Sequence, residues 1–312
     1  MILIDYTQVA LGSLMVSLNR GEELSKNLAR HITLNSLRHY RSKFTEDYGE
    51  LVICCDSRKY WRREYFPNYK ANRKKDREKS EYDWNFIFEI LNDIEDELKE
   101  FFPYKVIEVE GAEADDIIAT LSNCGEEQIM IVSSDKDFIQ LHSFLVEQYS
   151  PLTKKLVNNN DPKQYLKEHI IKGDRSDGIP NVLSADDTFI SEKRQKPIRK
   201  TLIAELTEQM GKYEPEDLYN LAKCPKDTWV RNWHRNETLI DLNKIPTTIC
   251  QNILKEFDTI EVGRRDKLFN YFIENKLTNL LDNIDSNQFA QYHNLTFVDG
   301  TESTSRTTTF PT

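Results

Sequence analysis

Short apolar runs that end in an aspartate alternate with helix-like stretches through the first half of the chain. The runs at 2–4 and 51–55 lead directly into Asp5 and Asp56, and the run at 129–132 leads through two serines to Asp135. A fourth apolar run covers 106–109, and apolar side chains recur at helical spacing over 22–43, 81–102 and 113–121. Strands that alternate with helices predict an α/β fold with a mostly parallel central sheet and helices on both faces.

The second half of the chain has a different pattern. A length of 312 residues is typical of about two domains. We predict an α/β domain over residues 1–157 and a helical domain over 158–290, because strand-like runs stop near residue 158. Residues 291–312 are rich in Thr and Ser, so we expect a disordered tail there.

Several classes of protein are disfavoured by composition. No apolar run approaches the ~18 residues of a membrane-spanning helix, and the first residues lack the basic region of a secretory signal. We therefore expect a cytoplasmic protein that does not engage a membrane. The five cysteines form no Cys-x-x-Cys pair and the histidines show no regular metal-binding spacing, which indicates reduced thiols rather than a zinc site.

Carboxylates gather at the positions where a parallel sheet binds ligands. The carboxyl ends of parallel strands meet at one edge, so Asp5, Asp56 and Asp135 are predicted to lie together. Asp137 follows two residues after Asp135, and further acids begin the 113–121 helix or stand three residues apart beyond residue 170. These further candidates are Glu113, Asp115, Asp174 and Asp177. We expect Asp116 to be structural or to stand behind the metal ligands, because it points about 100° around the helix from Asp115.

Eight clustered carboxylates require cations, because like charges at short distance disfavour ionisation. Oxygen-only ligands favour Mg²⁺, for which Mn²⁺ can substitute. A set divided between strand ends and a later helical turn predicts two ions, as in phosphodiester hydrolysis. A single strand-end Asp is most often only a turn or cap residue, so the prediction rests on the joint placement.

Two basic segments stand out in a chain whose formal net charge is −10. Between residues 58 and 79 there are ten Lys and Arg against three acids, with five aromatic side chains among them. That composition suits nucleic-acid phosphates and bases, and we expect residues 58–80 to become ordered on binding. The second segment contains Lys193, Arg194, Lys196, Arg199 and Lys200.

Taken together, these motifs resemble the flap endonuclease and 5′-nuclease family and, within it, the ribonuclease H group of T-even bacteriophages. The resemblance covers roughly residues 1–285. It is carried by Leu3-Ile4-Asp5, Cys55-Asp56, Trp61-Arg62-Arg63-Glu64, Tyr69-Lys70-Ala71-Asn72-Arg73, Glu113-Ala114-Asp115-Asp116, Ser134-Asp135-Lys136-Asp137-Phe138 and Gly173-Asp174-Arg175-Ser176-Asp177.

The resemblance implies a role for each matching residue. Asp5, Asp56, Glu113, Asp115 and Asp135 would surround a first Mg²⁺, and Asp137, Asp174 and Asp177 would hold a second. Lys70 and Arg73 would be catalytic residues of a helical arch at 58–80. We expect nucleic-acid contacts at Arg62, Arg63, Tyr69 and the second basic segment. The chain lacks the second glycine pair found in the cellular family after Asp177, so a monovalent-ion site does not follow from the resemblance.

The expected function is a two-metal 5′ to 3′ exonuclease with ribonuclease H and flap endonuclease activity. Such an enzyme removes RNA primers and adjacent DNA during phage replication, in the cytoplasm of the infected host cell. The resemblance implies a monomer that acts on RNA·DNA and DNA·DNA duplexes with 5′ ends or flaps, with a phage single-stranded DNA-binding protein as partner. Two alternatives remain at this point: a PIN-like single-strand ribonuclease and an inactive DNA-binding accessory protein.

Overall fold

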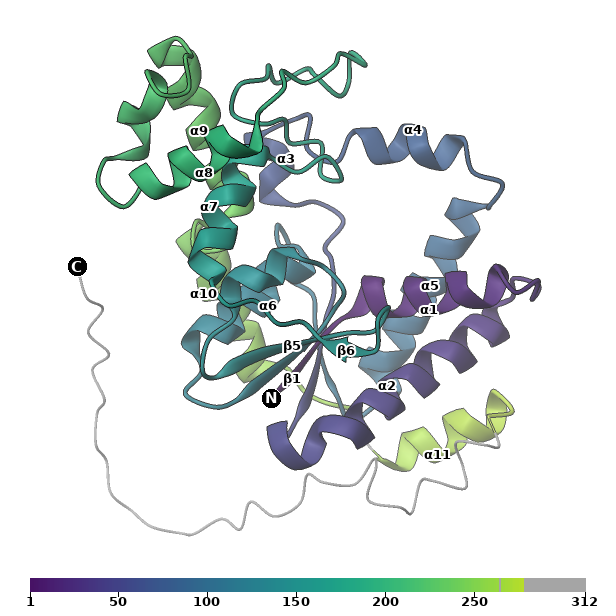
Figure 1. Ribbon diagram of the computed structural model, residues 1–312. Helices are drawn as coiled ribbons and strands as arrows, with labels where there is room; N and C mark the ends of the chain where they lie inside the picture. The colour runs from purple at the N-terminus through teal and green to yellow at the C-terminus, as the bar shows by residue number, and fades with distance from the viewer. Residues whose placement is uncertain (264, 278–312) are drawn as a thin grey trace, which may run out of the picture.

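A six-stranded, mostly parallel sheet forms the centre of the molecule (Figure 1). The computed structural model describes residues 1–263 and 265–277. The strand order is β3-β2-β1-β4-β5-β6, and only β6 runs antiparallel to its neighbour. The strands are β1 (Ile2–Asp5), β2 (Leu51–Cys54), β3 (Lys105–Ile107), β4 (Ile129–Val132), β5 (Val146–Ser150) and β6 (Lys155–Leu156). The predicted fold class, including helices on both faces, is confirmed.

Strands β1, β2 and β4 are buried on both faces, which is why they appear in the sequence as continuous apolar runs. β1 pairs in parallel with both β2 and β4, so the strand order reverses beside it. In open parallel sheets such a switch point is where ligands bind, beyond the carboxyl ends of the strands. The sequence analysis missed β5 and β6, because β5 mixes apolar with polar residues and β6 has only two residues.

One face of the sheet is covered by helices α1 (Tyr6–Leu18), α2 (Lys26–Tyr48), α5 (Trp84–Phe101) and α11 (Arg265–Glu274). Helix α5 has a strongly one-sided apolar stripe that includes Ile87, Ile94 and Leu98, and this stripe is buried. Helix α1 was not predicted, because its apolar residues do not gather on one side.

The opposite face is covered by α6 (Ala114–Cys124) and α10 (Thr247–Thr259). Ile117 and Ile118 of α6 share one apolar cluster with Ile249 and Ile253 of α10. Helix α10 thus belongs to the body of the sheet although it follows the helical region in the sequence. The predicted boundary near residue 158 does not separate the packing units, since α10 and α11 both return to the sheet.

A third apolar cluster lies beyond the carboxyl ends of the strands. It is formed by α7 (Pro162–Lys172), α8 (Lys200–Gln209), α9 (Lys226–Ile240) and the 3₁₀ helix η2 (Pro215–Tyr219). Phe66 and Tyr69 from the first basic segment are buried in the same cluster. This arrangement anchors one end of that segment to the helical region.

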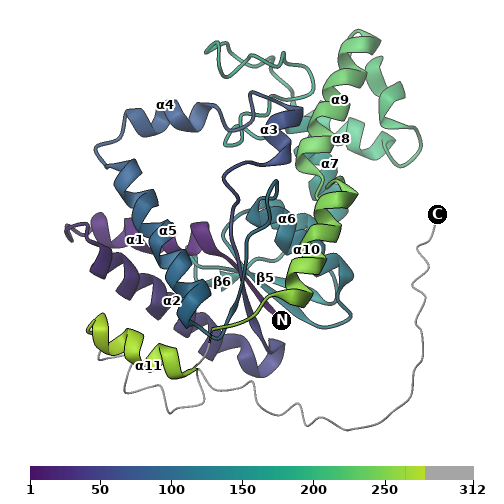
Figure 2. The same cartoon turned by 180° about the vertical axis from the view of Figure 1, so that it is seen from behind.

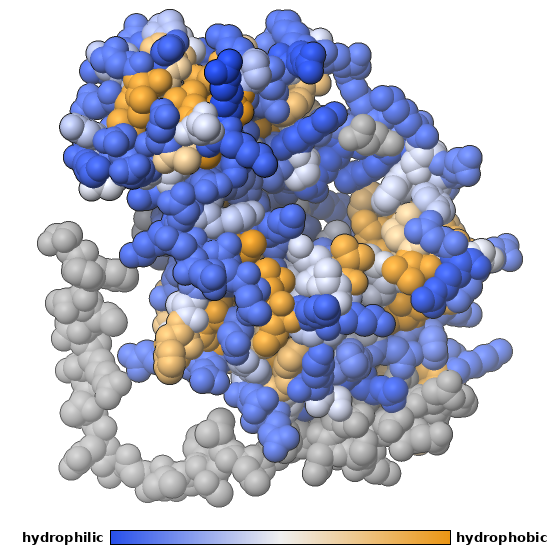
Figure 3. All heavy atoms as spheres, viewed as in Figure 1, coloured by the Kyte–Doolittle hydropathy of each residue, from blue (hydrophilic) through white to orange (hydrophobic). Residues whose placement is uncertain are grey.

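The first basic segment forms two short helices, α3 (Trp61–Tyr65) and α4 (Asn72–Glu78). Both views show α4 lying above the sheet, between α3 on the side of the helical region and α5 on the other side (Figures 1 and 2). The expected tail at 291–312 and the end of the predicted helical domain lie outside the described residues. Within the residues described, no helix has the length and hydropathy that crossing a bilayer requires. The space-filling view shows a surface that is mostly hydrophilic, with scattered apolar patches (Figure 3).

Candidate active site

Three of the predicted acids lie at the carboxyl ends of neighbouring strands: Asp5 at β1, Asp56 after β2 and Asp135 after β4. Asp5 ends β1 and caps α1, where its Oδ1 accepts a hydrogen bond from the backbone N–H of Gln8. The Ser133 hydroxyl, from the turn after β4, donates to Asp5 Oδ2 at 2.8 Å. Asp56 follows β2, and its Oδ1 accepts from the backbone N–H of Ala114 at 2.9 Å. These hydrogen bonds hold the carboxylates at the ends of β1 and β2 in fixed positions.

The start of helix α6 contributes two more acids. Glu113 caps the helix, and Asp116 accepts a hydrogen bond from the Glu113 backbone N–H at 3.0 Å, which completes a reciprocal capping box. Asp115 lies between them and belongs to the acid cluster, whereas Asp116 is fully buried. The expectation that Asp116 is structural is confirmed by its capping role.

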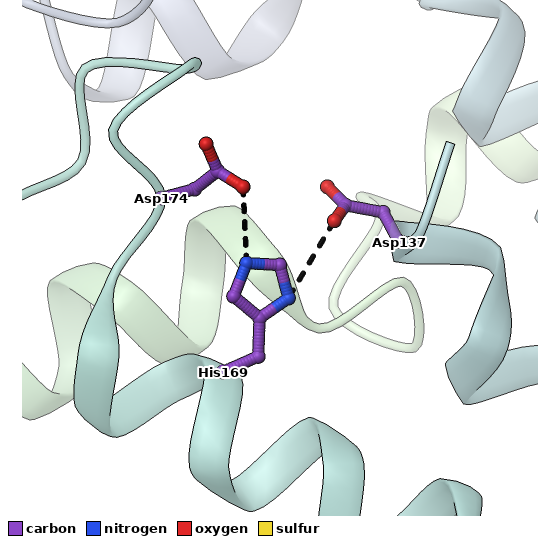
Figure 4. A group of neighbouring side chains, drawn as sticks. All are labelled: Asp137, His169 and Asp174. Carbon is purple, nitrogen blue, oxygen red and sulfur yellow. Dashed lines mark hydrogen bonds and ion pairs between the residues drawn. The ribbon is translucent and has the colours of Figure 1, made fainter. Parts of the chain in front are cut away.

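The remaining acids come from two segments that meet at helix α7. Asp137 begins the 3₁₀ helix η1 (Asp137–Leu141), and Asp174 and Asp177 lie just beyond α7. His169 in the last turn of α7 lies between two of these carboxylates (Figure 4). Its Nε2 is 3.0 Å from Asp174 Oδ2, and its Nδ1 is 3.5 Å from Asp137 Oδ1. The sequence analysis missed His169, because an isolated histidine on a helix carries no spacing signal.

Two glycines make the turn that carries Asp174 and Asp177. Gly173 has a φ of 66°, and a Cβ there would lie 2.4 Å from the carbonyl oxygen of Ile179. Gly178 has a φ of 73°, and a Cβ there would lie 3.0 Å from the carbonyl oxygen of Asn68. Gly173 therefore has no room for a side chain, and the positive φ and the tight contact at Gly178 also favour glycine there. Helix α9 supports the far side of the turn, where the Asn236 amide donates to the carbonyl of Pro180 at 2.9 Å.

Burial and mutual repulsion raise the pKa values of several of these carboxyls. Burial, with a contribution from Asp56, raises the pKa of Asp5 to about 7. Burial, with a contribution from Asp135, raises the pKa of Asp137 to about 8. The pKa values of Asp115 and Asp135 are raised for the same two reasons. The eight predicted acids therefore form one electrostatically linked cluster, as expected from their strand-end positions.

Asp174 is the exception in this cluster. Burial alone would raise its pKa, but hydrogen bonds from His169 and Ser176 outweigh that effect and hold the pKa well below its usual range. Burial alone would lower the pKa of the His169 imidazole, but Asp174 and Asp137 outweigh that effect and raise it.

Lys70 and Arg73 reach this cluster from the first basic segment. The Lys70 ammonium lies 2.6 Å from Glu113 Oε1, and the Arg73 Nη2 donates to Asp177 Oδ1 at 2.7 Å. Lys70 has a φ of 55°, which is uncommon for a residue other than glycine and is typical of strained functional positions. Its backbone N–H also donates to the carbonyl of Asp177 at 2.7 Å. Both residues therefore lie beside the carboxylates.

Arg62 and Tyr69 are not available to nucleic acid, so these two predicted contacts are wrong. Arg62 is 2% exposed, and its Nη1 lies 2.9 Å from Glu113 Oε2 and 2.8 Å from Asp116 Oδ1. Tyr69 is also 2% exposed, and its hydroxyl lies 2.9 Å from Asp177 Oδ2 and 3.1 Å from Glu113 Oε2. Both side chains position acids, because a buried carboxylate needs a cation or a hydrogen-bond donor beside it. Arg63, the next residue, is exposed.

The two basic segments meet on the surface. A hollow of about 750 Å³ lies between α4 and the segment 192–198. Lys75 of α4 donates to the carbonyl of Ile190 at 3.2 Å, which holds the two sides together. The cations that line the hollow are Lys75, Lys79, Arg175, Lys193, Arg194 and Lys196. Arg199 and Lys200, also predicted to contact nucleic acid, are exposed at the start of α8 and do not line the hollow.

Comparison with known proteins places this geometry in a family. Residues 9–170 match the family described as 5′-3′ exonuclease, N-terminal resolvase-like domain, and residues 162–288 match T4 RNase H, C terminal. The chain is 34% identical to the ribonuclease H of Enterobacteria phage T4 over 90% of its own length and 94% of the relative. The chain belongs to the 5′-3′ exonuclease family, in the group of T4 ribonuclease H. The two matched ranges cover the sheet from β2 to β6, the acids of the cluster other than Asp5, and the helical region.

Other members of the family match less of the chain. The 5′-3′ exonuclease of Buchnera aphidicola subsp. Schizaphis graminum is 33% identical over 48% of the chain and 53% of its own length. Two solved structures share the fold. The bacteriophage T5 flap endonuclease in a pseudo-enzyme-product complex with DNA and metal ions is 17% identical, with a TM-score of 0.55 over 88% of this chain and 97% of that one. The T5 5′-exonuclease with bound zinc is 18% identical, with a TM-score of 0.53 over 89% and 98%.

The donor set of the cluster fits divalent cations. The raised pKa values of Asp5 and Asp137 indicate that a cation beside these carboxyls would favour their ionised forms. Oxygen donors dominate, as hard divalent ions require. Asp137, His169 and Asp174 each offer a ligand atom within 4.8 Å of the others. The acid cluster of this chain thus has the charge and the donor atoms that divalent-metal binding requires.

Proposed function

We propose that the protein is a magnesium-dependent 5′ to 3′ exonuclease with ribonuclease H and flap endonuclease activity. The observation that carries the proposal is the acid cluster at the carboxyl ends of β1, β2 and β4, with Lys70 and Arg73 directed into it. Family membership supports hydrolysis of nucleic acid, and the metal-bound T5 enzymes support divalent ions. Primer removal in phage replication, in the host cytoplasm, is the role that suits such an enzyme.

Two groups of acids would bind the two ions. Asp5, Asp56, Glu113, Asp115 and Asp135 would hold the first ion, and Asp137, Asp174 and Asp177 would hold the second. Bound Mg²⁺ or Mn²⁺ lowers the pKa of water and stabilises charge on the phosphate oxygens and the leaving oxygen. Arg62 and Tyr69 lie behind the proposed ligands Glu113 and Asp177 and keep these carboxylates in place. These contacts would keep the closely spaced carboxylates ordered at the reaction centre.

Lys70 and Arg73 act on the substrate in this proposal. Each is held next to a carboxylate, and each carries a cation that stays protonated at neutral pH, because the neighbouring acids raise its pKa. When the scissile phosphate enters, these cations lie beside it and stabilise the negative charge that develops on its oxygens. Because the Lys70 backbone is anchored to the turn at Asp177, the pair is positioned before substrate binds.

The basic hollow between α4 and residues 192–198 is the proposed contact with the duplex backbone. Six cations and one acid line it, so it attracts phosphates although the whole chain is acidic. RNA·DNA and DNA·DNA duplexes with 5′ ends or flaps are the proposed substrates. A monomer assisted by a phage single-stranded DNA-binding protein remains the proposed working form.

A duplex labelled at either end tests the proposal. Incubation with Mg²⁺ of blunt, nicked and 5′-flapped RNA·DNA and DNA·DNA forms is expected to release short oligonucleotides from the 5′ end. Products recessed from the 3′ end would overturn the polarity. Cleavage of free single-stranded RNA in preference to every duplex form would support the PIN-like alternative, and binding without cleavage of any form would support the accessory-protein alternative.

A further inference from the structure

His169 is the histidine that the described part of the chain places among the predicted metal-binding acids. It comes from the last turn of α7, between a carboxylate of η1 and one of the Gly173 turn. Its side chain is 11% exposed, so the ring is held by the protein rather than by solvent. The imidazole occupies the position that links two otherwise separate segments (Figure 4).

The two ring nitrogens are not equivalent. Nε2 is engaged by Asp174 Oδ2 at 3.0 Å. Nδ1 is buried and makes no hydrogen bond within the described residues, although Asp137 Oδ1 lies 3.5 Å away. A buried ring nitrogen without a partner is unfavourable, and such a group calls for a ligand. A cation between Nδ1 and Asp137 would satisfy it, while Asp174 fixes the ring through the other nitrogen.

Space for an ion is available beside the ring. A hollow of about 390 Å³ opens there, lined by Asp135, Asp137, His169, Asp174 and Ser176 together with Gln8, Ser134, Lys136 and Tyr165. His169 therefore lies at the margin of a hollow lined mainly by polar and charged side chains. A hydrated divalent ion has room to bind there and exchange.

We propose that His169 supplies a nitrogen ligand to the second divalent ion and so makes this site selective for Mn²⁺ over Mg²⁺. The inference rests on the proposed function, because it concerns the ion held by Asp137 and Asp174. Imidazole is a favourable ligand for first-row transition ions, whereas Mg²⁺ prefers oxygen donors and retains water. The nitrogen therefore stabilises Mn²⁺ more than Mg²⁺ at a site that otherwise contains only carboxylates.

Mn²⁺ binding to the full-length protein without nucleic acid provides a test independent of activity. Protein with ¹⁵N-labelled histidine is loaded with Mn²⁺, and pulsed electron paramagnetic resonance is used to detect coupling between the ion and ¹⁵N. The expected result is one such coupling, which disappears in His169→Gln and persists in the matched control His234→Gln. His234 is a half-exposed residue of α9 that faces Glu216, away from the acid cluster. No coupling in the wild-type protein, or coupling that persists in His169→Gln, would overturn the proposal.

Calorimetric titration separates this inference from the proposed function. The affinity of the second site for Mn²⁺ is expected to fall by ~10-fold or more in His169→Gln, and that for Mg²⁺ by less than ~3-fold. Equal losses for both ions would make His169 only a positioning residue and would overturn the selectivity. Cleavage of a 5′-labelled duplex in Mg²⁺ by the wild-type protein reports on the proposed function alone, so that function can stand while the role of His169 fails.

Discussion

The Lys70 ammonium nitrogen lies 2.6 Å from Glu113 Oε1, although the two residues are 43 positions apart in the sequence. Lys70 lies in the first basic segment, just before α4, and Glu113 caps helix α6. The contact therefore joins the segment above the sheet to the acid cluster at the strand ends. In the proposed function, this pair links the segment that contacts substrate to the metal-binding acids.

Removing the two inward cations is expected to slow cleavage more than it weakens binding. In the double variant Lys70→Gln and Arg73→Gln, turnover at saturating substrate should fall by ~10²- to 10³-fold, because the cations stabilise charge that develops in the transition state. Single-turnover kinetics and a duplex-binding assay measure the two effects. Lys74→Gln, an exposed change on the same helix, is the control. A loss of affinity as large as the loss of turnover would contradict this role.

Replacing the neighbouring residues Arg62 and Arg63 is expected to change the stability of the protein by very different amounts. Arg62→Met leaves Asp116 buried without a cation and Glu113 with Lys70 as its remaining one, so the free energy of unfolding should fall by ~3 to 5 kcal/mol. Arg63→Met removes an exposed cation and should change it by less than ~0.5 kcal/mol. Urea denaturation of the two variants provides the measurement. Equal stability of both would show that the buried pair contributes nothing.

The strand-end acids were predictable because apolar runs locate β1, β2 and β4 without ambiguity. Once parallel strands are assigned, Asp5, Asp56 and Asp135 must share an edge. Asp137 could be assigned to the same edge because it follows Asp135 by only two residues. The strand β5 could not be predicted, since its short run mixes apolar with polar residues and so does not stand out from a loop.

Burial of charge could not be predicted from the sequence. Arg62 and Arg63 are identical in type and adjacent, yet one points into the acid cluster and the other into solvent. That difference depends on the position of Glu113, which only the folded chain defines. His169 was missed for the same reason, because its partners Asp137 and Asp174 come from separate segments.

The metal-free protein is expected to lose stability as the pH rises. The pKa values of Asp5 and Asp137 rise from 3.8 to about 7 and about 8 on folding, so the folded chain retains protons that the unfolded chain has released. Stability conferred by these protonated carboxyls is fully present below the unfolded pKa of 3.8 and is lost progressively as the pH rises towards about 8. The raised pKa of His169 acts in the same direction.

Thermal unfolding in chelator at about pH 5.5 and about pH 8 checks this sign. The melting temperature should be lower at the higher pH, and added Mg²⁺ should raise it more there, because ions bind the deprotonated carboxylates. A melting temperature that increases with pH in chelator would contradict the account of the cluster.

Neutralising the basic hollow is expected to weaken duplex binding in a salt-dependent way. In Lys193→Ala with Arg194→Ala, the slope of log affinity against log salt concentration should become shallower by ~0.9 for each phosphate that the variant no longer neutralises. The matched control removes two exposed cations outside the hollow, Lys255→Ala with Lys267→Ala. Binding measured at several salt concentrations decides the point. An unchanged slope in the first variant, or an equal change in both, would place the duplex elsewhere.

The most direct test of the central claim is cleavage of a 5′-labelled RNA·DNA duplex by the wild-type protein, Asp56→Asn and Asp135→Asn. Asparagine retains an acceptor oxygen for the backbone N–H groups of Ala114 and Asp137, so the variants remove the ligand charge and keep these bonds. The account predicts release of short 5′-labelled products by the wild-type protein in Mg²⁺, none in chelator, and a rate at least ~100-fold lower in either variant with duplex binding retained. Full turnover in either variant or in chelator would contradict it.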